Sequence, residues 1–247
     1  MDVSIVIPAY NEESRVIPTL ERIHEYFRRR EMEFEIIVVD DGSKDNTVEA
    51  VRQWQKNRLF PSPLRGEDEG GGEIVRIISH PVNKGKGAAV RTGVIEAKGD
   101  LILFSDADLS TPIEEFEKLK KAIDDGYDVA IGSRGMPDSD VKVKQNLLRR
   151  MIGAMGSYVI KLLVIKTFAD TQCGFKMFRA EKGKALFKRQ KISGFAFDVE
   201  MLYRAVRKNY RVKEVPVVWI NSSMSRVDAL RDPLRVLRDL FRIRTGF

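Results

Sequence analysis

Residues 101–110, LILFSDADLS, run from an apolar, strand-like segment directly into two aspartates, Asp106 and Asp108. Comparable runs rich in apolar and β-branched residues lie at Val3–Ile7, Glu35–Val39, Ile74–Ser79 and Asp128–Ile131. Helical patterns fall between these runs, at about 13–30, 47–57, 86–97 and 112–125. Strands that alternate with helices predict an α/β fold, in which a mostly parallel sheet carries helices on both faces.

The second half of the chain follows a different pattern, because the alternation stops after Arg134. It predicts a long helix at about 145–166, a turn-rich segment at 170–178 (DTQCGFKMF), a helix near 197–208, a strand at 212–219 and a final helix. Asp232 and Pro233 have the residue types of an N-cap and a first helical position for that final helix. The final helix is amphipathic, with Leu234, Leu237, Leu240 and Phe241 on one face and Arg235, Arg238 and Arg242 on another.

These patterns predict one large domain with an extension. Residues 1–225 form the α/β domain, and 226–247 form a basic amphipathic extension. The segment 58–73 is rich in Pro and Gly and has almost nothing to bury, so we interpret it as a mobile surface insertion. A lid over the functional site is the alternative for this segment.

The charge balance points to anionic partners. The chain has 43 Lys and Arg against 36 Asp and Glu, a net charge of +7, which fits phosphates, lipid headgroups or nucleic acid. A nucleic-acid-binding module does not explain the acidic residues after the predicted strands, since these would repel a polyanion, and no RNP, zinc-finger or helix-turn-helix pattern is present. We therefore expect no nucleic-acid partner.

The cysteine content and the hydropathy favour a cytoplasmic protein. Cys173 is the single cysteine and there are two histidines, so the chain can form neither an internal disulfide nor a Cys/His zinc cluster. The sequence begins without a signal-peptide pattern. Its most apolar stretch, 151–168, is interrupted by Lys161 and Lys166 and does not reach the roughly 18 uncharged apolar residues of a membrane span. Contact with a membrane is therefore expected to be peripheral.

Polar clusters follow four of the predicted strands. They are PAYNEE at 8–13, DDGSKDNT at 40–47, SDADLS at 105–110 and GSR at 132–134. Any one of them alone is typical of a turn or a helix cap. Because the carboxyl ends of parallel strands meet at one edge of a sheet, the four together predict a pocket there.

Asp106 and Asp108 are candidate metal ligands. In an extended segment, residues two apart point the same way, so both carboxylates can face one hard cation. Mg²⁺ and Mn²⁺ suit such a pair, since these ions are usually completed by water and substrate phosphates. The metal would stabilise the charge on a departing nucleoside diphosphate.

Other residues at the same edge suit a nucleotide. One carboxylate of the pair Asp40 and Asp41 can accept a hydrogen bond from a base or a ribose. The residue types of a base and ribose slot also occur, at Pro8, Tyr10 and Glu12. In the run NKGKGAAVRTG, at 83–93, Lys84 or Lys86 would lie near the donor phosphates.

The ordered set PAYNEE, VVDDGS, NKGKGAA and SDADLS resembles family 2 glycosyltransferases, which have the Rossmann-like GT-A fold, over about residues 3–225. The segment DTQCGFKMF, followed by GFAFDVEMLY at 194–203, is similar to the dolichyl-phosphate glucose synthase branch and also to polyprenyl-phosphate mannose synthases. The resemblance implies inverting transfer of glucose from UDP-glucose, or of mannose from GDP-mannose, to a polyprenyl or dolichyl phosphate.

The resemblance also implies roles for individual residues. The implied catalytic residues are Asp106, Asp108 and Arg134, with Mg²⁺ or Mn²⁺ held by the two aspartates. Donor contacts are implied at Pro8, Ala9, Tyr10, Glu12, Asp40, Asp41, Lys86, Asp106 and Ala107. Mannose synthases often have Gln two positions after the second aspartate, where this chain has Ser110, so a third protein ligand to the metal is not implied.

The acceptor decides which further groups are needed. A phosphate monoester is largely dianionic at neutral pH and needs cations rather than a strong base, and Arg134, Arg149 and Arg150 are candidates. For Arg149 and Arg150 a solvated helix face is the alternative. A soluble saccharide acceptor would instead require a carboxylate base, for which Asp198 or Glu200 are candidates, unless they are buried structural acids.

The basic final helix has two interpretations. An apolar stripe beside arginines is typical of a helix that lies on anionic lipid. A helix that docks on a second subunit has the same appearance, so a homo-oligomer stays possible.

Overall fold

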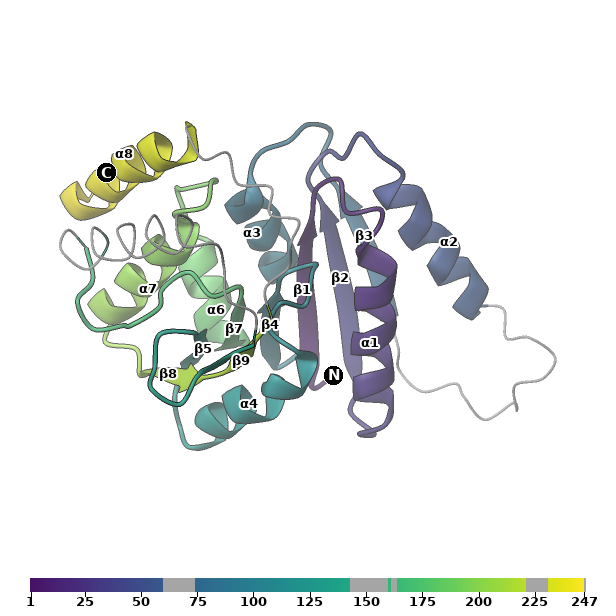
Figure 1. The fold of residues 1–247 in the computed structure, drawn as a ribbon, viewed down its shortest axis with the longest axis horizontal. Coiled ribbons are helices and arrows are strands. Elements are labelled where there is room, and N and C mark those ends of the chain that lie inside the picture. Colours follow the sequence, from purple (N-terminus) through teal and green to yellow (C-terminus); the bar gives the residue numbers. More distant parts are fainter. Residues whose placement is uncertain (60–73, 143–159, 161–163, 221–230, 247) are drawn as a thin grey trace.

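The computed structural model describes residues 1–59, 74–142, 160, 164–220 and 231–246 (Figure 1). Most of the proposed insertion at 58–73 lies outside these residues. So do Arg149, Arg150 and most of the helix predicted at 145–166.

A seven-stranded sheet forms the centre of the fold, in the order β3-β2-β1-β4-β7-β5-β8. Neighbouring strands run parallel except at β7, which is antiparallel to both β4 and β5. The strands are β1 (Val3–Ala9), β2 (Phe34–Asp40), β3 (Ile74–Ser79), β4 (Leu101–Ser105), β5 (Val129–Ser133), β7 (Phe175–Arg179) and β8 (Val212–Pro216). The predicted mostly parallel sheet is thus confirmed.

Helices cover both faces of this sheet, as predicted (Figure 1). The helices are α1 (Val16–Arg28), α2 (Thr47–Leu59), α3 (Lys86–Glu96), α4 (Phe116–Asp124), α6 (Ala180–Phe187), α7 (Phe197–Arg207) and α8 (Arg231–Thr245). Residues of α1, α2 and α4 pack with Ile5 on one face, whereas residues of α3, α6 and α7 pack with Val6 on the other. The alternation of side chains along β1 therefore serves two apolar cores.

The prediction of a turn-rich segment at 170–178 is wrong in its second half. Residues 175–179 form β7, which lies between β4 and β5 in the middle of the sheet. Lys176 breaks the apolar run FKMF and yet is only 1% exposed. A lysine inside an apolar run argues against a buried strand. Here the charge of Lys176 is balanced by Asp198, on helix α7, which the sequence around β7 does not reveal.

The strand predicted at 212–219 is divided. Its first part is β8, and Val218–Trp219 form β9, which pairs in parallel with β6 (Asp140–Val141) in a separate two-stranded sheet. This small sheet ties the segment after β5 to the segment after β8.

Helix α8 differs in two ways from the prediction. The described helix, Arg231–Thr245, already contains Asp232 and Pro233, so Asp232 is not its N-cap. Its predicted apolar stripe is also divided, because Leu240 is 1% exposed while Leu237 and Phe241 are 47% and 65% exposed. Leu240 packs into the same apolar core as α7. Among the described residues, no helix is long and apolar enough to cross a membrane.

Candidate functional site

The loops after β1 and β2 are joined at the carboxyl edge of the sheet, as predicted. Ala9 and Asp40 are paired at the ends of their strands. The backbone N–H of Asn11 donates to Ser43 Oγ at 2.8 Å, and Lys44 N–H donates to Asn11 Oδ1 at 2.7 Å. The structure therefore brings together the clusters PAYNEE and DDGSKDNT. Pro8 and Ala9 are buried, whereas Tyr10 is partly exposed.

Asp40 and Asp41 are both 2% exposed and fix the backbone around the site. Asp40 Oδ1 accepts from Ser43 N–H at 3.1 Å. Asp41 accepts from the backbone N–H groups of Lys84 at 2.9 Å and Gly85 at 2.7 Å, and its Oδ1 lies 2.7 Å from Nδ1 of His80. Asp41 thus holds the turn that leads into α3, and its contact with a nucleotide stays a prediction.

Glu12 and Asp108 are linked by Arg15, which the sequence interpretation missed. Arg15 Nε and Nη2 each donate to the carboxylate of Glu12 at 2.7 Å, and Arg15 Nη1 lies 3.8 Å from Asp108 Oδ2. The signal in the sequence is an acid and an arginine three residues apart, which lie in the turn before α1, where Arg15 N–H also donates to the carbonyl of Glu12 at 2.9 Å. Asp108 Oδ1 also accepts from Ser110 N–H at 3.0 Å.

The segment that carries Asp106 and Asp108 is a turn, so the expectation of an extended segment is wrong. Leu109 N–H donates to the carbonyl of Asp106 at 3.3 Å, and Leu109 has a φ of 44°. The two carboxylates therefore have different partners. Asp108 contacts Arg15 and Ser110, as described above, and the carboxylate of Asp106 lies against Gly174, where a Cβ would stand 2.0 Å from Asp106 Oδ2.

A chain of alternating charges lies beside Asp106. Lys86 Nζ is 2.7 Å from Asp106 Oδ1, and Lys176 Nζ is 2.6 Å from Asp198 Oδ1. The two ammonium groups lie 5.4 and 5.9 Å from the ring centre of Phe104. Burial by itself lowers the pKa of Lys86, but the nearby charges of Asp106 and Asp198 outweigh it, so that the pKa is raised. Lys86 is therefore a cation in this site.

Asp198 and Glu200, the candidates for a base, are both buried. Asp198 is 3% exposed, and burial raises its pKa against the opposing charges of Lys176 and Lys86. Glu200 is fully buried and accepts from the backbone N–H groups of Lys191 and Ile192 at 2.9 and 2.8 Å. Glu200 could contact an acceptor only if these two hydrogen bonds were broken. The role of Glu200 in acceptor binding stays a prediction.

Arg134, at the end of β5, is fixed by Asp170. Its Nε and Nη2 donate to the two oxygens of Asp170 at 2.6 and 2.9 Å, and its guanidinium lies 5.5 Å from the ring centre of Trp219. Burial by itself raises the pKa of Asp170, but Arg134 outweighs it and the pKa is lowered. Burial by itself lowers the pKa of Arg134, but Asp170 outweighs it and Asp106 adds a smaller contribution, so that the pKa is raised.

The surroundings of Asp106 fit a divalent cation. Its Oδ1 is buried and, although Lys86 is close, accepts no hydrogen bond of good geometry. Within the described residues no group of three or more His, Cys, Asp or Glu could hold a metal. A site built on Asp106 and Asp108 would therefore need water or substrate oxygens as its other ligands, which suits Mg²⁺ and Mn²⁺.

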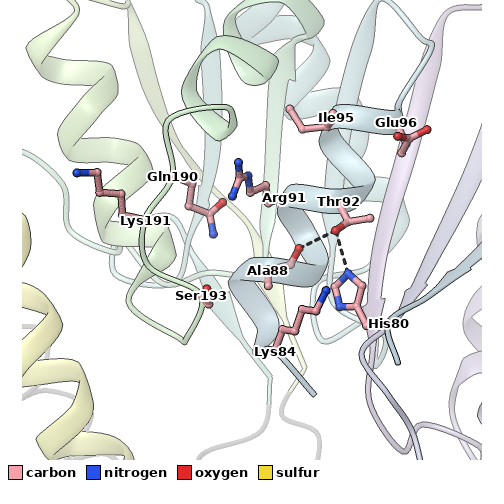
Figure 2. Close-up of a pocket in the computed structure, with 10 residues that line it drawn as sticks. All are labelled: His80, Lys84, Ala88, Arg91, Thr92, Ile95, Glu96, Gln190, Lys191 and Ser193. Carbon is pink, nitrogen blue, oxygen red and sulfur yellow. Dashed lines mark hydrogen bonds between the residues drawn. The ribbon is translucent and has the colours of Figure 1, made fainter. Parts of the chain in front are cut away.

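A hollow of about 670 Å³ lies along α3 (Figure 2). His80 connects it to the site, since its Nε2 lies 2.9 Å from Thr92 Oγ1 while its Nδ1 contacts Asp41. Lys84 and Arg91 give the hollow a basic character. Its lining does not include Asp106 or Asp108.

Comparison with known proteins gives relatives along most of the chain. A dolichyl-phosphate beta-glucosyltransferase of Trichomonas vaginalis is 38% identical over 226 residues, which cover 87% of this chain and 63% of that protein. The dolichyl-phosphate beta-glucosyltransferases of Drosophila melanogaster and Homo sapiens are each 32% identical and cover 98% and 99% of this chain. This chain spans 74% and 75% of their lengths.

Solved structures share the fold at low sequence identity. Glucosyl-3-phosphoglycerate synthase of Mycobacterium tuberculosis, in complex with Mn²⁺ and UDP-glucose, has a TM-score of 0.67 at 15% identity and covers 100% of this chain and 79% of its own. Mannosyl-3-phosphoglycerate synthase of Rubrobacter xylanophilus has a TM-score of 0.67 at 19% identity and covers 100% and 73%. The model of the family "Glycosyl transferase family 2" matches residues 4–231 of this chain. The chain is a member of glycosyl transferase family 2 and has the GT-A fold.

Proposed function

We propose that this chain transfers glucose from UDP-glucose to dolichyl phosphate or another polyprenyl phosphate, with inversion at the anomeric carbon. The names of the relatives support the glucosyl group and the dolichyl phosphate. The complex of the Mycobacterium tuberculosis enzyme with Mn²⁺ and UDP-glucose supports the donor and the metal. The observation that carries the proposal is the carboxylate of Asp106, which lies in a space left by Gly174 and is bordered by cations.

The donor would lie along the loops after β1, β2 and β4. Glu12 and Tyr10 would meet the nucleoside, and Asp106 with Asp108 would hold Mg²⁺ or Mn²⁺. When bound, the ion supplies Lewis-acid stabilisation of the charge on the leaving diphosphate. Lys86 would add a positive charge at the N-terminus of α3, where anions are favoured.

The acceptor phosphate would lie against Arg134. Asp170 binds the Nε–Nη2 edge of this guanidinium, holds it in a fixed orientation and leaves the side chain 32% exposed. A dianionic phosphate attacks without a general base, and the pairing of Asp198 with Lys176 leaves that carboxylate poorly suited to act as one. This arrangement favours a phosphate acceptor over a saccharide hydroxyl.

The chain would work at the cytoplasmic face of a membrane, where its acceptor is embedded. The outer face of α8 supports this location, because Leu237 and Phe241 are exposed next to arginines. The exposed arginines of α8 are Arg235, Arg238, Arg242 and Arg244. Asp239 is 8% exposed and lies 3.5 and 3.8 Å from guanidinium nitrogens of Arg238 and Arg242, so it offsets part of this positive charge and leaves a net excess of arginine. Exposed apolar residues among arginines suit a surface of anionic lipid.

Purified protein with radiolabelled sugar nucleotides tests this function. We expect transfer from UDP-glucose to dolichyl phosphate in the presence of Mn²⁺ or Mg²⁺, loss of transfer with EDTA, and a β-linked product. Asp108→Ala should lower kcat/KM at least 100-fold, because removal of a metal ligand forfeits several kcal/mol of stabilisation. Asp124→Asn, on the exposed surface of α4, is the matched control.

The alternatives give different results in the same assay. Preference for GDP-mannose would make the chain a mannosyltransferase of this family. Transfer to a soluble saccharide but not to dolichyl phosphate, together with loss of turnover in Asp198→Asn, would show that the acceptor is a saccharide hydroxyl and that Asp198 is the base. Full activity of Asp108→Ala in the presence of EDTA would contradict the metal mechanism.

A further inference from the structure

The cations that border Asp106 and Asp108 differ in how firmly they are held. Arg15 makes two hydrogen bonds to Glu12, and Arg134 makes two to Asp170. Lys176 is 2% exposed at its side chain and bonds both Asp198 and the carbonyl of Cys173. These three side chains are each fixed by a partner outside the aspartate pair.

Lys86 is held differently. Its short contact is with Asp106 itself, at 2.7 Å, and its side chain is 24% exposed. The other acids that act on it are Asp198 and Asp108, at longer range. An ammonium group on a flexible four-carbon stem can leave such a partner at low cost.

The backbone of Lys86 is nevertheless well anchored. It is the first residue of α3, directly after Gly85, which has a φ of 104° and donates its N–H to Asp41 at 2.7 Å. A Cβ on Gly85 would lie 2.5 Å from the carbonyl oxygen of Ser193, so the turn is packed tightly. The ammonium group can therefore move while its Cα stays in place.

We propose that Lys86 is a built-in counter-cation of Asp106, which competes with the divalent ion for that carboxylate and is released when a donor diphosphate offers it a new partner. This inference rests on the metal site of the proposed function. Like charges close together repel strongly in a partly buried site, so Lys86 and a divalent ion cannot share Asp106 without a large penalty. Lys86 would have to turn away before the ion could bind.

Coupling between metal and donor follows from this competition. Without a nucleotide, the ammonium group that leaves Asp106 gains no new anion, so the ion binds weakly. With a nucleotide, the diphosphate accepts the ammonium group, so the ion binds more tightly. By linkage, the ion then raises the affinity for the nucleotide by the same factor. Lys86 would thus keep the divalent ion from binding tightly until the nucleotide donor is bound.

Titration of the purified protein with MnCl₂ tests the inference, with free Mn²⁺ measured by electron paramagnetic resonance in the presence and absence of UDP. For Lys86→Met we expect the Kd for Mn²⁺ without UDP to fall at least about fivefold, the low end of couplings between sites. The tightening of Mn²⁺ binding by UDP should shrink by a similar factor. Mn²⁺ alone should also raise the Tm more in Lys86→Met than in the wild type.

Two further variants separate competition from other effects. Lys98→Met removes the same charge from an exposed side chain just after the other end of α3, and should leave both Kd values unchanged. Lys86→Arg keeps the cation and should resemble the wild type. If Lys98→Met matches Lys86→Met, net charge explains the effect and the inference is wrong.

The inference and the proposed metal site fail in different ways. Suppose that the wild type binds Mn²⁺ with UDP, but that Lys86→Met leaves the Kd for Mn²⁺ without UDP unchanged or raises it. Lys86 then does not compete with the ion for Asp106, and only the inference is wrong. If the wild type binds no Mn²⁺ with or without UDP, the metal site itself is wrong and the inference falls with it.

Discussion

Gly174 leaves the space that the carboxylate of Asp106 fills, since a Cβ on Gly174 would lie 2.0 Å from Asp106 Oδ2. The same two residues are joined through the backbone, where Asp106 N–H donates to the carbonyl of Gly174 at 3.0 Å. A residue after β4 and a residue before β7 thus shape one side of the site.

Gly174→Ala should therefore disturb the site more than the fold. The added methyl group must push the carboxylate of Asp106 aside. Because a displacement of about 1 Å in a functional group can reduce its effect about 100-fold, we expect the Kd for Mn²⁺ in the presence of UDP to rise at least about tenfold. Gly194→Ala is the control, since the nearest atom to its Cβ would be 4.0 Å away. Unchanged Mn²⁺ binding in Gly174→Ala would show that Asp106 is not a ligand.

The pair of Arg134 and Asp170 should make the free energy of unfolding depend on pH in the acidic range. Because the pKa of Asp170 is lowered in the folded protein, its ionised form stabilises the fold at pH values above its ordinary pKa of about 3.8, and this contribution is lost as the pH falls further. Asp170→Asn should lower the free energy of unfolding by about 3 kcal/mol at pH 7, as expected when a buried pair is broken. Urea unfolding at pH 7 and near pH 3 measures the difference, which should shrink in acid; a difference that grows in acid would contradict this assignment.

Cys173 should react slowly with thiol reagents. It is 1% exposed, and its burial, aided by the charge of Asp170, raises its pKa to about 11. The reactive thiolate is therefore scarce at pH 8. We expect slow labelling of the folded protein by iodoacetamide and complete labelling in urea, followed by mass spectrometry. Fast labelling of the folded protein would show that the segment before β7 opens.

The outer face of α8 should bind anionic vesicles. Leu237→Glu with Phe241→Glu should reduce co-sedimentation with phosphatidylserine vesicles at least about tenfold, because it removes apolar contact and adds negative charge. Folding should be little affected, since both side chains are exposed. Vesicles of phosphatidylcholine alone should bind weakly to either protein.

A second copy of the chain is the other candidate for covering this face of α8. A dimer that the double variant converts to a monomer, with no change in vesicle binding, would assign the face to self-association. Size-exclusion chromatography with light scattering distinguishes this outcome from membrane binding.

The sequence predicts the parallel part of the sheet well and the antiparallel strand poorly. Most residues of β1, β2 and β4 are apolar, because these strands are covered on both faces. In β7 the run is broken by Lys176, and the acid that neutralises it lies 22 residues further along the chain, on α7. No local pattern reveals such a partner.

The meeting of the candidate loops at one edge of the sheet was predictable, but the directions of their side chains were not. Clusters after parallel strands must meet at one edge, whatever their details. Whether Asp106 and Asp108 point the same way depends on the backbone between them, which turns at Leu109 with a positive φ that the residue type does not indicate. Gly174 and Arg15 escaped notice because their roles come from contacts with other loops.

The central position of β7 also determines when the enzyme can take shape during its synthesis. Strand β5 meets β4 only through β7, so a ribosome must finish residue 179 before the two halves of the sheet can be joined. Until then the hydrogen-bonding edges of β4 and β5 that β7 will occupy stay without it, and such edges invite pairing with other chains. A nascent chain arrested before that residue should therefore aggregate readily, however complete its nucleotide loops are.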